Sequence, residues 1–244
     1  MSGVIAVITL RQLVSRRRTI LLLLLGGIMV LVAFVLRLSL DEVYWQLYTS
    51  RLLSNFGIAV LMPLVALLFG TGAIGGELDD GTAVYLLAKP VNRWRVLGTK
   101  LAVAAVASVV LTCLPVLAAG LILDGGLGDG LVIGFTVAAA VGSVVYCAVF
   151  VALSLMTSRA LVFGLAYVLI WEGLLSGLFA GTRTFSVRQQ TLALVDVFAE
   201  VPTRVFEAQL ALGTALVVGA LILVGAILLA GRRLAEIEIA GDTA

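Results

Sequence analysis

The feature that most limits the possible folds is a series of apolar runs, each long enough to cross a lipid bilayer. The clearest run is TILLLLLGGIMVLVAFVL, residues 19–36, which contains no charged side chain. A transmembrane helix needs about 20 consecutive apolar residues. Only 12% of the 244 residues are charged and 62% are hydrophobic, whereas about 25% are charged in soluble domains. The pattern predicts an all-α, polytopic membrane protein.

Six spans are expected in a single transmembrane domain over residues 1–244, with an amphipathic helix lying in the membrane interface before them. Arg16–Arg18 and the following leucines resemble a signal peptide, but the apolar run continues to Leu36, so we expect a retained span. The interfacial helix is predicted over residues 2–18, and the spans over residues 19–36, 52–75, 96–123, 131–156, 160–180 and 210–230.

The distribution of basic residues predicts the orientation. Most of the 16 Lys and Arg residues fall in the N-terminal segment, in residues 76–100, in 157–159 and after residue 231. Short cytoplasmic loops are enriched in Lys and Arg, so these segments and both termini are expected in the cytoplasm. Residues 181–209 then lie on the outer side, where Val187, Leu192, Val195 and Phe198 predict a short amphipathic helix before Pro202. On physical grounds alone, a surface loop resting on lipid is an equally good interpretation of this segment.

Small residues recur at four-residue spacing in three spans, and two interpretations of them stay open. Such stripes let helix backbones approach closely in a bilayer, but Ala and Gly are also common throughout this chain. The stripes are Gly134/Ala138/Gly142, Ala104/Ser108/Thr112 and Ala215/Gly219.

One charged segment, GELDDGTAVYLLAKPVNRWRVLGTK, interrupts the apolar runs at residues 76–100. Asp79 and Asp80 are suited to the start of a short helix, because carboxylates are favourable near free N–H groups and the positive end of the helix dipole. Pro90 would end that helix. A rigid helix presenting Tyr85, Leu86 and Leu87 to the cytoplasm suits a docking contact with another protein, although a simple solvated loop is the alternative.

The same segment is not a nucleotide site. Its glycine and hydroxyl spacing resembles a phosphate-binding loop, but the required lysine is missing and Glu77, Asp79 and Asp80 would repel a phosphate. If ATP drives this protein, a different chain must bind it.

The run Glu77-x-x-x-Gly81-Thr82-x-x-x-Leu86-Leu87-x-x-Pro90-x-x-Arg93-x-x-x-x-x-x-Lys100 resembles the first cytoplasmic loop of ABC-2-type transporter permeases. The Arg-rich N-terminal helix, the six spans and the long outer segment before the last span are also similar to that family. One position departs from the family pattern, because Arg95 stands where an acidic residue is common, which removes a capping box at Asn92.

The resemblance implies a non-catalytic permease subunit of an ABC transporter in the plasma or inner membrane, most simply an exporter. It implies pairing with a second permease, identical or related, within the membrane lipids. It also implies a cytoplasmic ATPase subunit that binds ATP and magnesium, so this chain would hold no cofactor. The residues expected to couple the two subunits are Glu77, Gly81, Thr82, Tyr85, Leu86, Leu87, Pro90 and Arg93.

Glu172 is a separate candidate, because it lies about 18 Å into the expected fifth span at 1.5 Å per residue. An ionisable group at that depth is costly unless it is paired or hydrated. It either faces a translocation pathway or is a structural residue held by neighbouring hydroxyl groups, and both interpretations stay open.

The remaining chemistry is sparse. The chain has no histidine and a net charge of +2, so neither a histidine-based site nor nucleic-acid binding is expected. Cys113 and Cys147 lie in apolar runs and are expected to act as small apolar residues.

The alternative function is an intramembrane lipid-modifying enzyme with a cytoplasmic acidic site at Glu77, Asp79 and Asp80. A channel or ion-coupled carrier is a poor match, since there is one buried carboxylate and no internal repeat.

Overall fold

A computed structural model describes residues 9, 17–79, 93–176 and 180–239 of the chain. Within these ranges all regular structure is helical, which confirms the all-α fold class. Most of the expected interfacial helix, residues 2–18, lies outside the described residues.

Five of the described helices are long and apolar enough to cross a membrane, in agreement with a polytopic protein. They are Thr19–Ser39, Glu42–Ile74, Arg93–Asp124, Leu131–Met156 and Leu212–Leu234. The span expected at residues 131–156 has the predicted bounds, and the span expected at 52–75 begins about three turns earlier in the chain, at Glu42. The span expected at 160–180 is not a single α-helix.

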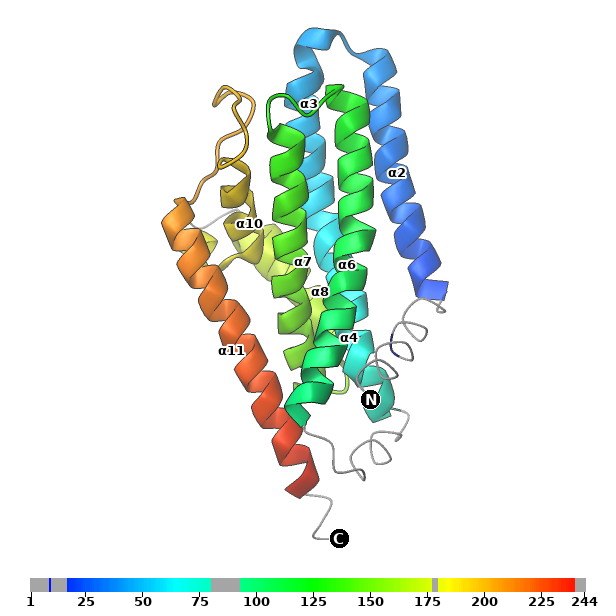
Figure 1. The fold of residues 1–244 in the computed structure, drawn as a ribbon, viewed down its shortest axis with the longest axis vertical. Helices are drawn as coiled ribbons and strands as arrows, with labels where there is room; N and C mark the ends of the chain where they lie inside the picture. Colours follow the sequence, from blue (N-terminus) through cyan, green and yellow to red (C-terminus); the bar gives the residue numbers. More distant parts are fainter. Residues whose placement is uncertain (1–8, 10–16, 80–92, 177–179, 240–244) are drawn as a thin grey trace.

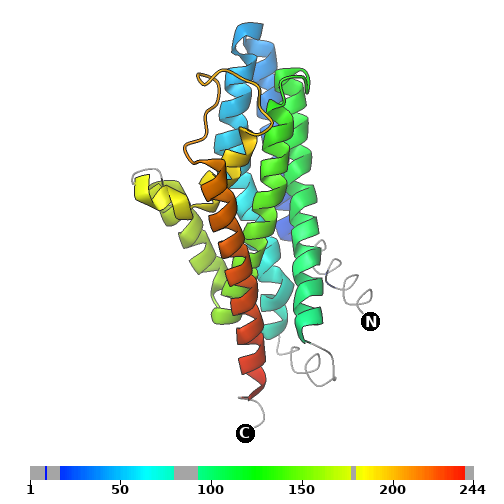
Figure 2. The ribbon, with the colours of Figure 1, turned by 60° about the vertical axis from the view of Figure 1, so that its left-hand side comes forward.

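The long helices run side by side as a bundle around α7 (Leu131–Met156) (Figure 1; Figure 2). α7 contacts both α4 (Met62–Asp79) and α6 (Arg93–Asp124), and α2 (Arg17–Ser39) packs on α6. α4 ends and α6 begins at one end of the bundle, here called the Arg93 end. The opposite end, where α6 ends and α7 begins, is called the Asp129 end.

The second crossing is built from successive helix types. A 3₁₀ turn, η1 (Glu42–Tyr44), leads into α3 (Trp45–Leu52), the π-helix η2 (Leu53–Leu61) and α4. A π-helix has i→i+5 hydrogen bonds and is often found at functional sites. Because η2 is wider than an α-helix, the side chains before and after it do not follow one 3.6-residue stripe.

Small residues lie where helix backbones approach each other, which favours the close-packing interpretation of the stripes. Ala104, Ser108 and Thr112 of α6 are fully buried. On α7, a Cβ added to Gly142 would overlap the side chains of Met62 and Thr191. Helices in lipid gain stability mainly from such close van der Waals packing.

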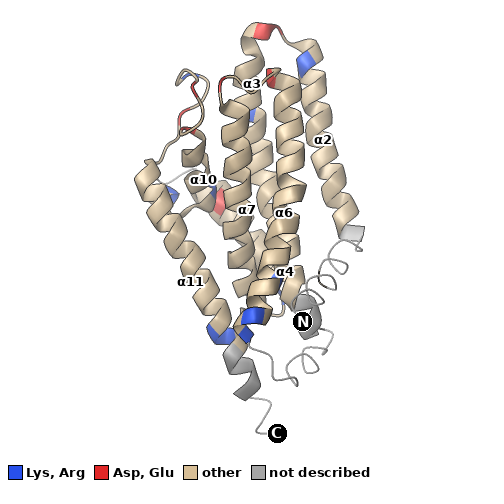
Figure 3. Cartoon of the chain, viewed as in Figure 1, with Lys and Arg blue, Asp and Glu red and all other residues tan. Residues whose placement is uncertain are grey.

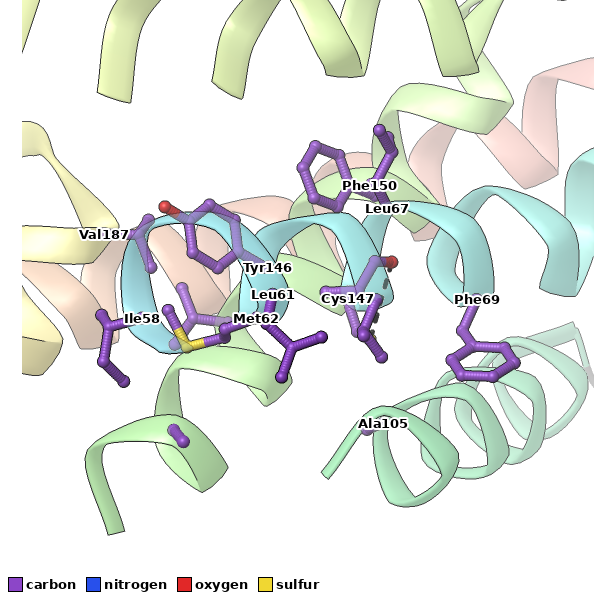
Figure 4. Packing of buried hydrophobic residues seen from close by; sticks show 14 of the residues in the cluster. Ile58, Leu61, Met62, Leu67, Phe69, Ala105, Tyr146, Cys147, Phe150 and Val187 are labelled. Carbon is purple, nitrogen blue, oxygen red and sulfur yellow. Dashed lines mark hydrogen bonds between the residues drawn. The ribbon is translucent and has the colours of Figure 1, made fainter. Parts of the chain in front are cut away.

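The core of the bundle is filled by aliphatic and aromatic side chains between α4, η2 and α7 (Figure 4). Tyr146 and Phe150 of α7 are fully buried and stack with ring centroids 5.7 Å apart. Cys147 lies in this core, with its Sγ 3.1 Å from the Ser108 Oγ, and both cysteines are free thiols. The described contacts agree with cysteines that act as small packing residues.

The fifth crossing is not one continuous helix. The apolar part covers Ala160–Leu175, made of α8 (Ala160–Ala166) and the π-helix η3 (Tyr167–Leu175). At the α-helical rise of 1.5 Å per residue this length is at most about 24 Å, short of the roughly 30 Å of a hydrocarbon core. The chain continues through η4 (Ala180–Phe185) into α10 (Val187–Val195).

α10 completes this crossing inside the bundle. Its Thr191 lies against Gly142 of α7 and its Val195 against Gly134, so α10 runs toward the Asp129 end. Val187, Leu192 and Val195 are buried against the neighbouring helices, as the amphipathic pattern predicted. The alternative of a surface loop resting on lipid is therefore wrong for residues 187–195, because they form a helix that is mostly covered by protein.

At the Asp129 end, Arg37 joins α2 to the turn after α6. Its Nη1 donates to the Leu123 carbonyl at 2.9 Å, and its Cζ lies 3.2 Å from the centre of the Trp45 ring. α11 (Leu212–Ile239) then returns to the Arg93 end along the outside of the bundle (Figure 1).

Candidate functional site

The predicted coupling segment joins the ends of α4 and α6. α4 extends to Asp79 and so includes the backbone of Glu77, while Arg93 is the first residue of α6 and is half-buried. The side chain of Glu77 is not described. The remaining predicted coupling residues lie outside the described residues: Gly81, Thr82, Tyr85, Leu86, Leu87 and Pro90.

A buried lysine connects the two helices that flank this segment. Lys100 of α6 is 2% exposed, and its Nζ donates to the carbonyl oxygen of Ala73 in α4 at 3.2 Å. A buried ammonium group is costly unless it is hydrogen-bonded. Lys100 therefore fixes α6 against α4 less than two turns from the end of the described part of α4.

The first turn of α6 also contacts α11. The indole ring of Trp94 lies against Gly231, so closely that a Cβ at that glycine would overlap the ring. The Trp94 side chain is also 52% exposed, which is compatible with a position at the membrane interface. The Arg93 end thus connects α6 to both α4 and α11.

Glu172 occupies a second polar site, near the middle of the bundle, where it connects η3 to α10. Its carboxylate accepts hydrogen bonds from Tyr167 Oη at 3.1 Å, from Val187 N at 2.9 Å and from the hydroxyl group of Ser186. The side chain is 2% exposed. Burial of a carboxylate is costly unless such bonds replace its hydration.

The Glu172 contacts satisfy the start of α10. Ser186 is the N-cap of α10 and its Oγ accepts from Gln189 N at 3.2 Å, while Glu172 accepts from Val187 N. The first N–H groups of a helix have no partner within the helix, and a carboxylate there is favoured by the helix dipole. These contacts suffice to account for Glu172, and its role in a translocation pathway stays a prediction.

One polar contact, between Arg188 and Asn55, was not predicted from the sequence. In the structure Arg188 Nη2 donates to Asn55 Oδ1 at 3.2 Å, which joins α10 to η2. The Ser186-x-x-Gln189 spacing was an available signal, because it matches a capping box and marks the start of α10. No sequence pattern pairs Asn55 with Arg188.

The acidic site of the alternative enzyme function falls on the side chains of Glu77, Asp79 and Asp80, which are not described. Among the described residues, no group of three His, Cys, Asp or Glu side chains is arranged to hold a metal ion.

A comparison with curated proteins gave no match. A family model described as ABC-2 family transporter protein matches residues 4–230. The match covers the five long helices up to residue 230, the short fifth crossing and the coupling segment, as the resemblance in residues 77–100 predicted. The chain belongs to the ABC-2 family of transporter proteins.

Proposed function

We propose that this membrane subunit is the permease of an ABC exporter, driven by ATP that a separate cytoplasmic subunit binds and hydrolyses. The observation that carries the proposal lies at the Arg93 end, where Lys100 connects α6 to α4 and Trp94 connects α6 to α11. α4 and α6 are the helices that precede and follow residues 80–92 in the chain. A family of transport subunits accounts for the absence of any catalytic motif in the sequence. ATP and magnesium would be held by the partner subunit, and this chain would bind no cofactor.

The charge distribution supports placing the Arg93 end in the cytoplasm. Among the described side chains, basic ones gather at that end and most acidic ones lie toward the opposite end (Figure 3). Arg93 and Arg95 begin α6, Arg159 precedes α8, and Arg232 and Arg233 lie near the end of α11. Lys and Arg near the ends of spans favour the cytoplasmic side. The protein would then reside in the plasma or inner membrane with α2 beginning and α11 ending inside.

The proposed mechanism is a rigid-body movement. α6 has 32 residues, which corresponds to about 48 Å, and it runs without a break from the coupling segment to the Asp129 end. A displacement of residues 80–92 by a docked ATPase would therefore move both α6 and, through Lys100, the end of α4. Two permeases, identical or related, would enclose the pathway between them.

Residues 77 and 81 provide the main test. Glu77→Ala and Gly81→Val should each abolish transport and the stimulation of ATP hydrolysis, while the amount of protein inserted in the membrane stays the same. The measurement is ATPase activity and transport in proteoliposomes containing the permease and its ATPase. Glu207→Ala is the matched control, since it removes an exposed carboxylate from the loop before α11. Survival of both activities in the Glu77 and Gly81 variants would overturn the coupling assignment.

A second prediction concerns Lys100. Lys100→Met keeps the length of the side chain but removes the hydrogen bond to Ala73, so ATP-coupled transport should fall at least about tenfold, because a hydrogen bond of a charged group is worth about 1.5–3 kcal/mol. Arg95→Gln removes a positive charge from the exposed face of the same helix and should change transport by less than about twofold. Equal effects of the two variants would show that charge, and not the α4–α6 connection, is responsible.

A further inference from the structure

Arg188, Asn55 and Arg51 form a polar patch on the side of the bundle, here called the Arg188 patch. Asn55 is exposed and half-buried Arg188 bonds to it, while Asn55 Nδ2 donates to the Arg51 carbonyl at 3.0 Å. Arg51 is also exposed, and its Cζ lies 5.9 Å from the centre of the Tyr48 ring. The patch therefore joins the Arg188 guanidinium to the Asn55 amide, which is held from both sides, and the exposed Arg51 lies about one turn away along the same crossing.

The patch lies deep between the two ends of the bundle. Thr191, less than one turn beyond Arg188 in α10, touches Gly142, which is eleven residues or about 17 Å along α7 from its first residue. Asn55 lies thirteen residues or about 20 Å from Glu42, where the second crossing begins. Both measures place Arg188 and Asn55 near the middle of a roughly 30 Å hydrocarbon core.

A half-exposed guanidinium at that depth is not suited to lipid. Contact with hydrocarbon costs at least about 2.5–3.5 kcal/mol for arginine at the bilayer centre, and arginines there generally face a hydrated cavity. Arg188 Nε is buried and has no hydrogen-bond partner in the described part of the chain. Within the same residues, Arg188 and Arg51 have no carboxylate ion pair. Among the described residues, the Arg188 patch thus has a hydrogen-bond donor without an acceptor, Arg188 Nε, and a positive charge without a paired carboxylate.

We propose that the Arg188 patch binds the acidic group of the transported molecule, a carboxylate, sulfate or phosphate attached to an apolar body. Charge complementarity and the donors of two guanidinium groups favour such an anion, because arginine bonds these groups in a bidentate manner. An apolar body is favoured because the patch opens sideways from an apolar bundle, and Val60, about one turn along the same π-helix, is 38% exposed. The inference rests on the proposed transport function and names its class of substrate.

Glu172 is a positioning residue for this site. It holds Val187 N and Ser186 at the start of α10, and Arg188 follows directly. Asn55 belongs to η2 and Glu172 to η3, so both of these π-helices contact the first turn of α10. This convergence gives the two π-helices a common role.

Cysteine accessibility tests whether the site is hydrated. In a Cys113→Ala background, Asn55→Cys should react with a water-soluble maleimide, and 1 mM dodecyl phosphate should slow that reaction. Val110→Cys is the matched control, since Val110 is 48% exposed, lies about 21 Å from the Asp129 end of α6, and should stay unreactive in lipid. An Asn55→Cys variant as unreactive as Val110→Cys, or one that forms a disulfide with a second copy, would overturn the proposal.

Binding measurements on the full chain in phosphatidylcholine nanodiscs test the substrate class. Dodecyl phosphate should bind, whereas dodecanol and dodecyltrimethylammonium should bind at least about tenfold more weakly. Arg188→Gln and Asn55→Asp should each weaken dodecyl phosphate binding at least about tenfold, the latter because its carboxylate would neutralise the guanidinium. Arg188→Lys keeps the charge but loses the bidentate geometry, so it should weaken binding less than Arg188→Gln does. Arg204→Gln, which removes an exposed charge after Pro202, should leave binding unchanged.

The two proposals fail in different ways. Unchanged affinity in both Arg188→Gln and Asn55→Asp would overturn the substrate-class inference even if ATP-coupled transport is demonstrated. Arg188-dependent binding that does not respond when the ATPase subunit is trapped with vanadate would retain the site and contradict the proposed function. If phosphatidylglycerol displaces dodecyl phosphate through Arg188 and remains bound through the ATPase cycle, the patch holds a structural lipid and the inference is wrong.

Discussion

Replacing Glu172 with leucine is expected to destabilise the protein by about 3 kcal/mol and to release α10 from η3. The variant would leave Val187 N–H and the Ser186 hydroxyl group without their buried acceptor, and each such group costs about 1–3 kcal/mol. Part of this loss is offset, because leucine removes the desolvation cost of a buried carboxylate. The measurements are the thermal unfolding midpoint in detergent and the rate of proteolysis within residues 176–200.

Two variants separate loss of the hydrogen bonds from loss of charge. Glu172→Gln retains a carbonyl acceptor for Val187 N and should destabilise the protein less than the leucine variant. Glu200→Leu removes an exposed carboxylate from the loop after α10 and should leave the unfolding midpoint unchanged. If Glu172→Leu unfolds at the same temperature as Glu200→Leu, the carboxylate does not anchor α10.

Replacing Gly130 with alanine is expected to disrupt the contact between the start of α7 and the loop after α10. Gly130 is the N-cap of α7 and has a φ of 71°, a left-handed conformation that costs other residues about 1–2 kcal/mol. In addition, a Cβ at this position would overlap the carbonyl oxygen of Phe198. Because that obstacle is backbone, the segment after α10 must move, and the unfolding midpoint should fall.

Gly128 provides the control in the same loop. It has no atom within 4 Å of an added Cβ and no positive φ, so Gly128→Ala should leave the unfolding midpoint nearly unchanged. Gly130→Asn tests which cause dominates, since asparagine tolerates the left-handed conformation but still collides with Phe198. Full stability of the asparagine variant would show that the conformation, and not the close approach, requires glycine.

Hydropathy predicted the fold class because each long helix carries its own signal. Residues 131–156 form one uninterrupted helix with the expected bounds, since that run contains no charged residue and no proline. The family was also predicted correctly, from the pattern between Glu77 and Lys100 together with the arrangement of the spans.

The fifth crossing could not be predicted in the same way. Residues 160–180 are as apolar as the other spans, and neither a π-helix nor a change of direction alters hydropathy. The interruption depends on Glu172 bonding to Ser186 and Val187, which are fourteen and fifteen residues away. Local sequence patterns do not encode a contact of that kind, so the depth of α10, and with it the position of Arg188, was not expected.

α11 buries little of its surface against the rest of the bundle. Only 6% of its most apolar window is buried, and its exposed side includes Leu216, Val217, Leu221, Val224 and Leu228. It meets the other helices mainly through small residues, with Ala215 and Ala230 buried and Gly231 against Trp94. Its mean hydropathy of 2.7 suffices for stable insertion without those neighbours. During biogenesis, insertion of α11 and its docking on the bundle are therefore separable steps, and small-residue substitutions would impair only the second.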